Sequence, residues 1–128
     1  MDKRPTHIMI HHTGVSYDKN QDQFRANNND HQIMNNPKSS LGMALAWHYE
    51  INKAGRATRA RADGERAYAC WQDGLNDGRC IHIAIDGNFD IEAPTFAQMQ
   101  CLKEILTEKV KEYDIPLENI IFHKIYTT

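Results

Sequence analysis

Apolar and β-branched residues gather in short runs along this chain, and such runs are typical of strands. The pattern predicts five strands, at residues 6–12, 44–52, 56–62, 80–85 and 120–123. The run at 80–85 is apolar on both faces except at His82, which predicts a central strand covered on both sides. Lys53-Ala54-Gly55 separates the second run from the third and predicts a hairpin turn.

One longer stretch has the periodicity of a helix. Thr95 and Gln98 form a capping box, and apolar residues then recur at steps of three and four up to Pro116. These apolar residues are Met99, Leu102, Leu106, Val110 and Tyr113. A second helix is predicted within the polar, Asn-rich residues 18–35, and residues 63–79 are predicted to form a long surface loop. The order of elements predicts an α/β fold, a single domain with a mixed central β-sheet flanked by helices.

Composition places the chain among small globular domains. Its 128 residues are 41% hydrophobic, enough for one core, so we expect residues 1–128 to form one domain and the protein to be a monomer. Fifteen basic and 17 acidic residues give a net charge of −2, which argues against nucleic acid or an anionic membrane as a partner.

The sequence shows neither a membrane span nor a secretory signal, because its apolar runs are too short for either. We therefore expect that the protein stays where it is made until it is released, or that its export signal lies outside this sequence. The three cysteines are an odd number without CxxC spacing, which argues against a disulfide framework. Buried thiols are favoured, and a bridge between Cys70 and Cys80 is the alternative.

Two of the predicted strands carry a histidine at or next to their carboxyl end, His11 on the first and His123 on the last. Imidazole is the commonest protein ligand for zinc, so two such strands side by side can hold one ion, with hydrogen-bonded surface residues as the alternative. His12 faces the side opposite to His11 by strand alternation and is assigned a structural role. His48 and His82 lie in apolar runs and are interpreted as hydrogen-bonded core histidines rather than ligands.

Four stretches, in this order, resemble the type 2 N-acetylmuramoyl-L-alanine amidases, a family that includes phage-type lysozymes and the peptidoglycan recognition proteins. They are residues 8–14 with the histidine pair, 46–55 with the hairpin, 81–98 with the central strand and the start of the helix, and 121–123 with the last histidine. The resemblance implies a zinc amidase fold that cleaves the amide joining the lactyl group of muramic acid to L-alanine of the stem peptide. It implies Zn²⁺ as the cofactor and peptidoglycan as the partner.

By the same resemblance, His11 and His123 are the expected zinc ligands. The family's third ligand, a Cys or Asp, follows the second histidine by a few residues, where this sequence reads Lys124-Ile125-Tyr126-Thr127-Thr128 and ends. A catalytic zinc takes three protein ligands and an open position for water, whose pKa it lowers to about 7. We therefore expect that a C-terminal segment with the third ligand is missing, and that this 128-residue form is impaired as an enzyme.

The resemblance also implies positions close to the water on the metal. Trp47 lies where many family members carry a tyrosine, although some relatives have tryptophan. Indole donates one hydrogen bond and cannot act as a base. Tyr49, two residues further on, is the alternative, because alternation puts it on the same side of a strand.

Four residues are candidates for substrate binding, namely His31, Tyr68, Trp71 and Arg61. His31 would line the groove from the predicted helix, with a solvated helix face as the alternative. Tyr68 and Trp71 would stack on sugar rings, with ordinary packing as the alternative. Arg61 would meet carboxylates of the stem peptide, although charge on an exposed edge strand explains the arginines of that strand equally well.

Three functions therefore compete. The favoured hypothesis is a zinc amidase that lyses or remodels the cell wall. The alternative is a non-catalytic peptidoglycan-binding module, which the incomplete ligand set and Trp47 motivate. An α/β scaffold without a cell-wall role has the least support.

Overall fold

The computed structural model describes residues 4–13, 37–43, 46–69, 76–89 and 92–122. Within them the elements in chain order are β1 (His7–His12), β2 (Tyr49–Ile51), β3 (Ala57–Arg59), β4 (Cys80–Ile85), α3 (Phe96–Tyr113), the 3₁₀ helix η1 (Leu117–Asn119) and β5 (Ile120–Phe122). The strands form one sheet in the order β3-β2-β4-β1-β5. β3 is antiparallel to β2 and the other neighbouring pairs are parallel, so the predicted mixed sheet is confirmed.

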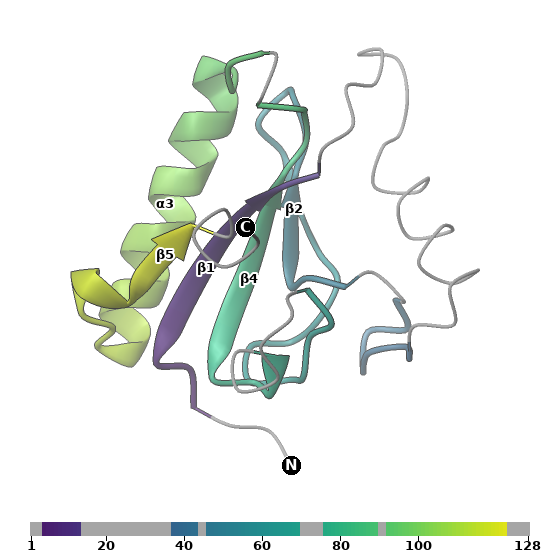
Figure 1. Ribbon diagram of the computed structural model, residues 1–128, viewed down its shortest axis with the longest axis vertical. Helices are drawn as coiled ribbons and strands as arrows, with labels where there is room; N and C mark the ends of the chain where they lie inside the picture. The colour runs from purple at the N-terminus through teal and green to yellow at the C-terminus, as the bar shows by residue number, and fades with distance from the viewer. Residues whose placement is uncertain (1–3, 14–36, 44–45, 70–75, 90–91, 123–128) are drawn as a thin grey trace.

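Helix α3 lies along one face of the sheet (Figure 1). The strand register pairs Ile8 with Ile81 and Ile10 with Ile83, and these side chains pack with Leu102 of the helix. The whole buried cluster consists of Ile8, Ile10, Ile51, Ile81, Ile83, Ile85, Leu102 and Ile115. A large apolar face on the sheet and one apolar stripe on the helix therefore make the core between the two layers.

The opposite face of the sheet is buried too. Side chains alternate along a strand, so Met9, His11, His82 and Ala84 point away from α3. Each of these residues is at most 4% exposed. Burial on both faces confirms the prediction that β4 is the central strand, and it puts histidines in the interior of the protein.

Strands β2 and β3 are shorter than the predicted runs at 44–52 and 56–62. The backbone N–H groups of Ala60 and Arg61 both donate to the carbonyl of His48, at 2.8 and 3.4 Å. Two residues of one strand then oppose one residue of the other, which is the arrangement of a β-bulge, and regular pairing ends there. The extra residue follows β3, so the bulge interrupts the side-chain alternation of the predicted run 56–62 at Ala60 and Arg61.

The capping box at the start of α3 is confirmed. Thr95 Oγ1 accepts from the Gln98 amide at 3.1 Å, and Gln98 Oε1 accepts from the Thr95 amide at 2.9 Å. Gln98 Nε2 also donates to the carbonyls of Asp86 at 2.8 Å and Ile51 at 3.3 Å. One side chain therefore caps the helix and ties its first turn to the carboxyl ends of β2 and β4.

A charged cluster joins the other end of α3 to the turn after β3. Asp63 Oδ2 accepts from Lys109 Nζ at 2.7 Å and from the Tyr113 hydroxyl at 2.9 Å, while its Oδ1 accepts from the Tyr49 hydroxyl at 3.2 Å. Burial alone would raise the pKa of Asp63, but hydrogen bonds from Lys109 and Tyr113 outweigh it and hold that pKa below its usual value. We refer to Asp63, Lys109, Tyr113 and Tyr49 as the Asp63 cluster.

Two predictions concern residues that the structure does not describe. The predicted helix at 18–35 and Cys70 lie outside the described residues, so the helix and the thiol-or-bridge alternative at Cys70 stay predictions. Among the described helices, none combines the length and the apolar character that a membrane crossing needs.

Candidate functional site

His11 lies near the carboxyl end of β1, on the face of the sheet away from α3. Its Nε2 is 2.8 Å from Nδ1 of His82 on β4, and the two ring centroids are 5.0 Å apart. This distance is that of a hydrogen bond, in which one of the two nitrogens donates and the other accepts. The predicted zinc ligand is therefore held by a side chain of the central strand, 71 residues away in sequence.

His48 extends this contact to a third imidazole. The His82 amide donates to His48 Nδ1 at 3.0 Å, and the two rings stack at 5.9 Å with an interplanar angle of 10°. His48 Nε2 is 2.9 Å from the carbonyl oxygen of Glu65. We call His11, His82 and His48 the histidine cluster. As predicted, His48 and His82 are buried and hydrogen-bonded core histidines, each 0% exposed.

The backbone fixes the proton position on His48. Its Nδ1 accepts from the amide of His82, so Nδ1 carries no proton, and Nε2 carries the proton that it donates to the carbonyl of Glu65. Burial lowers the pKa of His48 to about 4 despite that carbonyl. His48 is therefore a neutral imidazole of known tautomer at neutral pH.

Trp47 and Tyr49, the two candidates near the metal, have different surroundings. Trp47 Nε1 donates to Glu50 Oε1 at 3.2 Å. In the strand register, Glu50 of β2 pairs with Ala84 of β4, and Ala84 pairs with His11 of β1. The side chains of Glu50 and His11 therefore lie in one line across the sheet and on the same face. Tyr49 lies on the opposite face, in the Asp63 cluster against α3. The structure therefore associates Trp47 with the face that carries His11 and directs Tyr49 away from it.

Two residues of this face were not among the site residues proposed from the sequence. Glu50 is 1% exposed and lies in the row of His11, and His82 contacts His11 directly. The signal that could have found them is an ionisable residue inside an otherwise apolar run, because burying such a group is costly unless it has partners or a role.

Arg61 and Tyr68 lie together, but Arg61 is buried rather than displayed on an exposed strand. It is 2% exposed, and its guanidinium donates to the Pro37 carbonyl at 2.8 Å and to the Arg66 carbonyl at 3.4 Å. The guanidinium also lies 5.2 Å from the centroid of the Tyr68 ring. Burial lowers the pKa of Arg61. These contacts connect three loop segments, which is a structural use of the side chain.

His12 is exposed and points to the other side of β1, as predicted. Its Nδ1 accepts from the amide of Phe89 at 3.0 Å, and its ring stacks on the Phe89 ring with centroids 5.7 Å apart. His12 is therefore part of the loop that follows β4 and is separate from the histidine cluster.

The other predicted site residues, His123, His31 and Trp71, lie outside the described residues, so their roles stay predictions. Within the part of the chain that is described, no three His, Cys, Asp or Glu side chains gather closely enough to hold a metal ion. His11 can serve as one ligand of a metal ion. Its Nε2 is engaged with His82, so a metal would bind it at Nδ1.

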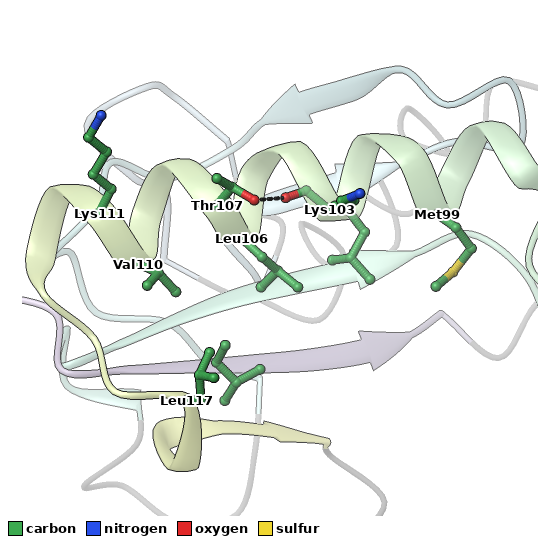
Figure 2. Close-up of a pocket in the computed structure, with 9 residues that line it drawn as sticks. Met99, Lys103, Leu106, Thr107, Val110, Lys111 and Leu117 are labelled. Atoms are coloured by element: carbon green, nitrogen blue, oxygen red, sulfur yellow. Dashed lines mark hydrogen bonds between the residues drawn. The ribbon is translucent and has the colours of Figure 1, made fainter.

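A pocket of about 510 Å³ lies on the other side of the sheet (Figure 2). The apolar stripe of α3 lines it together with Leu117 of η1 and Ile120 of β5. Ile120 pairs with Ile8, whose side chain faces α3. This pocket is therefore separated from the histidine cluster by the sheet.

Several solved structures are similar to this chain in fold. The N-acetylmuramoyl-L-alanine amidase LysC from Clostridium intestinale URNW is 23% identical, with a TM-score of 0.77 over 98% of this chain and 74% of that chain. The endolysin amidase LysCS from the same organism is 25% identical, with a TM-score of 0.71 over 98% of this chain and 72% of that one. Drosophila peptidoglycan recognition protein SD is 21% identical, with a TM-score of 0.75 over 95% of this chain and 70% of its own.

The fold thus belongs to the class of amidase and peptidoglycan recognition folds. The family model described as N-acetylmuramoyl-L-alanine amidase matches residues 1–128, and the chain is a member of this family. The comparison with curated protein sequences gave no match. Family and fold therefore confirm the resemblance and the fold class inferred from the sequence.

Proposed function

We propose that this chain is a zinc-dependent N-acetylmuramoyl-L-alanine amidase that hydrolyses the bond between the lactyl group of muramic acid and L-alanine in peptidoglycan. The observation that carries the proposal is the position of His11. It lies at the carboxyl end of a central parallel strand, held by a buried partner, in a chain that belongs to the amidase family throughout. His123 is the proposed second ligand.

His11 and Trp47 have different parts in the proposed reaction. A zinc ion, when bound, supplies an acidic water and a Lewis acid for the scissile carbonyl. His11 would be one of the residues that hold the ion. Trp47 lines the site and removes no proton, because indole is a donor and its N–H is used by Glu50. Tyr49 takes no part, since it faces α3.

The remaining substrate contacts are proposed from the sequence alone. Tyr68 and Trp71 would stack on sugar rings, and His31 would line the groove. Arg61 is not assigned to the substrate, because its guanidinium joins loop segments inside the protein.

Cleavage of purified peptidoglycan tests the proposal. We expect the chain, produced with any residues encoded after Thr128 and loaded with zinc, to release stem peptides with a free L-alanine amino group, detected by mass spectrometry. A chelator should abolish the release and added zinc should restore it. If the zinc-loaded protein binds peptidoglycan and releases no peptide, the proposed activity is wrong.

A non-catalytic peptidoglycan-binding module is the second candidate. Trp47 favours it, because a donor-only side chain replaces a group that could exchange a proton. This candidate predicts binding to cell-wall fragments that a chelator does not affect and that yields no product. Loss of binding on removal of zinc would contradict it.

A further inference from the structure

We infer that His82 is a positioning residue for His11: it accepts a hydrogen bond from His11 Nε2–H and thereby makes Nδ1 the metal-binding nitrogen of His11. The inference rests on the proposed function in one respect, since it concerns a residue proposed to bind zinc. It goes beyond that proposal by assigning a role to a central-strand histidine that does not itself bind the metal.

The first step is the contact itself. His11 Nε2 and His82 Nδ1 are 2.8 Å apart, so one proton lies between them. If His82 donated this proton, neutral His11 would carry its own proton on Nδ1, and neither of its nitrogens could bind a metal. If His11 donates, its Nδ1 has a lone pair that points elsewhere. A ligand role for His11 therefore requires that His82 be the acceptor.

The second step is the rigidity of the acceptor. His82 is 0% exposed in the middle of β4, which pairs with β1 on one side and β2 on the other. Its amide donates to His48 Nδ1 and its carbonyl accepts from the His48 amide at 2.9 Å. His48 is itself fixed by the carbonyl of Glu65. These hydrogen bonds fix the backbone of His82, and its buried ring stacks on the ring of His48, so turning the ring away from His11 would break that stacking.

The third step is the chemistry of such partners. A histidine that binds a metal almost always donates its other ring N–H to an acceptor, which fixes its tautomer and orientation. Removing the acceptor typically weakens metal binding about 10- to 100-fold. In this chain the acceptor is an imidazole from the neighbouring strand, reached from His11 through one hydrogen bond.

The first measurement is the protonation pattern of the metal-free, ¹⁵N-labelled 128-residue chain at pH 8, read from two-bond ¹H–¹⁵N correlation spectra. We expect Nε2 of His11 to be protonated, and Nδ1 of both His11 and His82 to be unprotonated. His48 serves as an internal reference, because its backbone contacts require a proton on Nε2. A proton on Nδ1 of His11 would overturn the inference.

The second measurement is zinc affinity, by titration calorimetry, of the matched variants His82→Asn and His82→Leu. Asparagine and leucine have nearly the same size, but Asn Oδ1 can take the place of the imidazole Nδ1 as acceptor and leucine cannot. We expect His82→Leu to bind zinc about 10- to 100-fold more weakly and His82→Asn to stay within about threefold of the unaltered chain. Equal affinities of the two variants would overturn the positioning role.

A third variant, Ile83→Val, controls for loss of stability, because Ile83 is in the same strand and faces α3. It should bind zinc as the unaltered chain does. The zinc titrations use the chain produced with any residues encoded after Thr128. If that chain binds no zinc, the proposed function is wrong, whereas the protonation pattern still decides the role of His82. If the His82 variants fail to fold, the protonation pattern of the unaltered chain still decides whether His82 is the acceptor.

Discussion

At the scale of single residues, the buried imidazole of His48 makes the stability of this protein depend on pH. The pKa of His48 is about 4 in the folded chain because burial disfavours the charged form, against 6.5 for an exposed histidine. Between these two pH values the unfolded chain therefore binds a proton at His48 and the folded chain does not. This contribution to stability is complete above pH 6.5 and is lost as the pH falls towards 4.

The size of this pH-dependent change in stability follows from the lowered pKa of His48. Because of His48, acidification from pH 7.5 to 4.5 should lower the free energy of unfolding by roughly 2 to 3 kcal/mol, at about 1.4 kcal/mol per pKa unit. Urea unfolding at both pH values, for the unaltered chain and for His48→Gln, measures it. The variant should lose less stability on acidification than the unaltered chain, since glutamine does not titrate. Equal losses in the two proteins would show that His48 is not held neutral.

At the scale of elements, the Asp63 cluster holds α3 to the strand pair β2 and β3. Asp63 and Lys109 have side chains that are each 5% exposed and lie 2.7 Å apart. Removing one partner of a buried ion pair leaves the other charge poorly compensated, which typically costs more than the pair itself contributes. The ends of the helix are therefore fixed by different means, one by a capping box and the other by charge.

Asp63→Asn should lower the free energy of unfolding by roughly 2 to 3 kcal/mol, because Lys109, Arg59 and two tyrosines lose a carboxylate partner. Among the described residues, Lys109 then keeps only the more exposed carboxylates of Glu108 and Glu112. Glu92→Gln is the matched control. Glu92 forms an ion pair of the same length with Lys53, at 2.7 Å, but both side chains are about a quarter exposed. The control should cost less than about 1 kcal/mol. Chemical denaturation of both variants measures the difference, and equal effects would contradict the structural role of the cluster.

The elements also show what the sequence can predict. Residues 80–85 and the helix after Thr95 were predicted closely, because a run of apolar residues and a capping box are local signals. The extents of β2 and β3 were not, because a bulge at His48 ends their pairing and nothing in the local pattern reveals it. Trp47 lies before the start of β2, so alternation along the strand does not fix its direction: its indole N–H contacts Glu50, whereas the Tyr49 hydroxyl contacts Asp63.

At the scale of the whole molecule, the site is made by strand register. The sequence predicted that His48 and His82 are buried and that His11 lies next to the end of a strand. It could not predict that the three rings meet, because this depends on how β1, β4 and β2 align across the sheet. Glu50 joins the same row for the same reason. Local patterns predicted which of these histidines are buried, and long-range strand pairing determined that they meet.

The measurement that tests the central claim most directly is the zinc affinity of His11→Ala compared with that of His12→Ala. The two residues are adjacent, but His11 belongs to the histidine cluster and His12 packs on Phe89. The account predicts that His11→Ala weakens zinc binding more than about 100-fold, because losing a ligand costs more than losing its partner. His12→Ala should stay within about threefold of the unaltered chain. Undiminished zinc binding by His11→Ala would contradict the account.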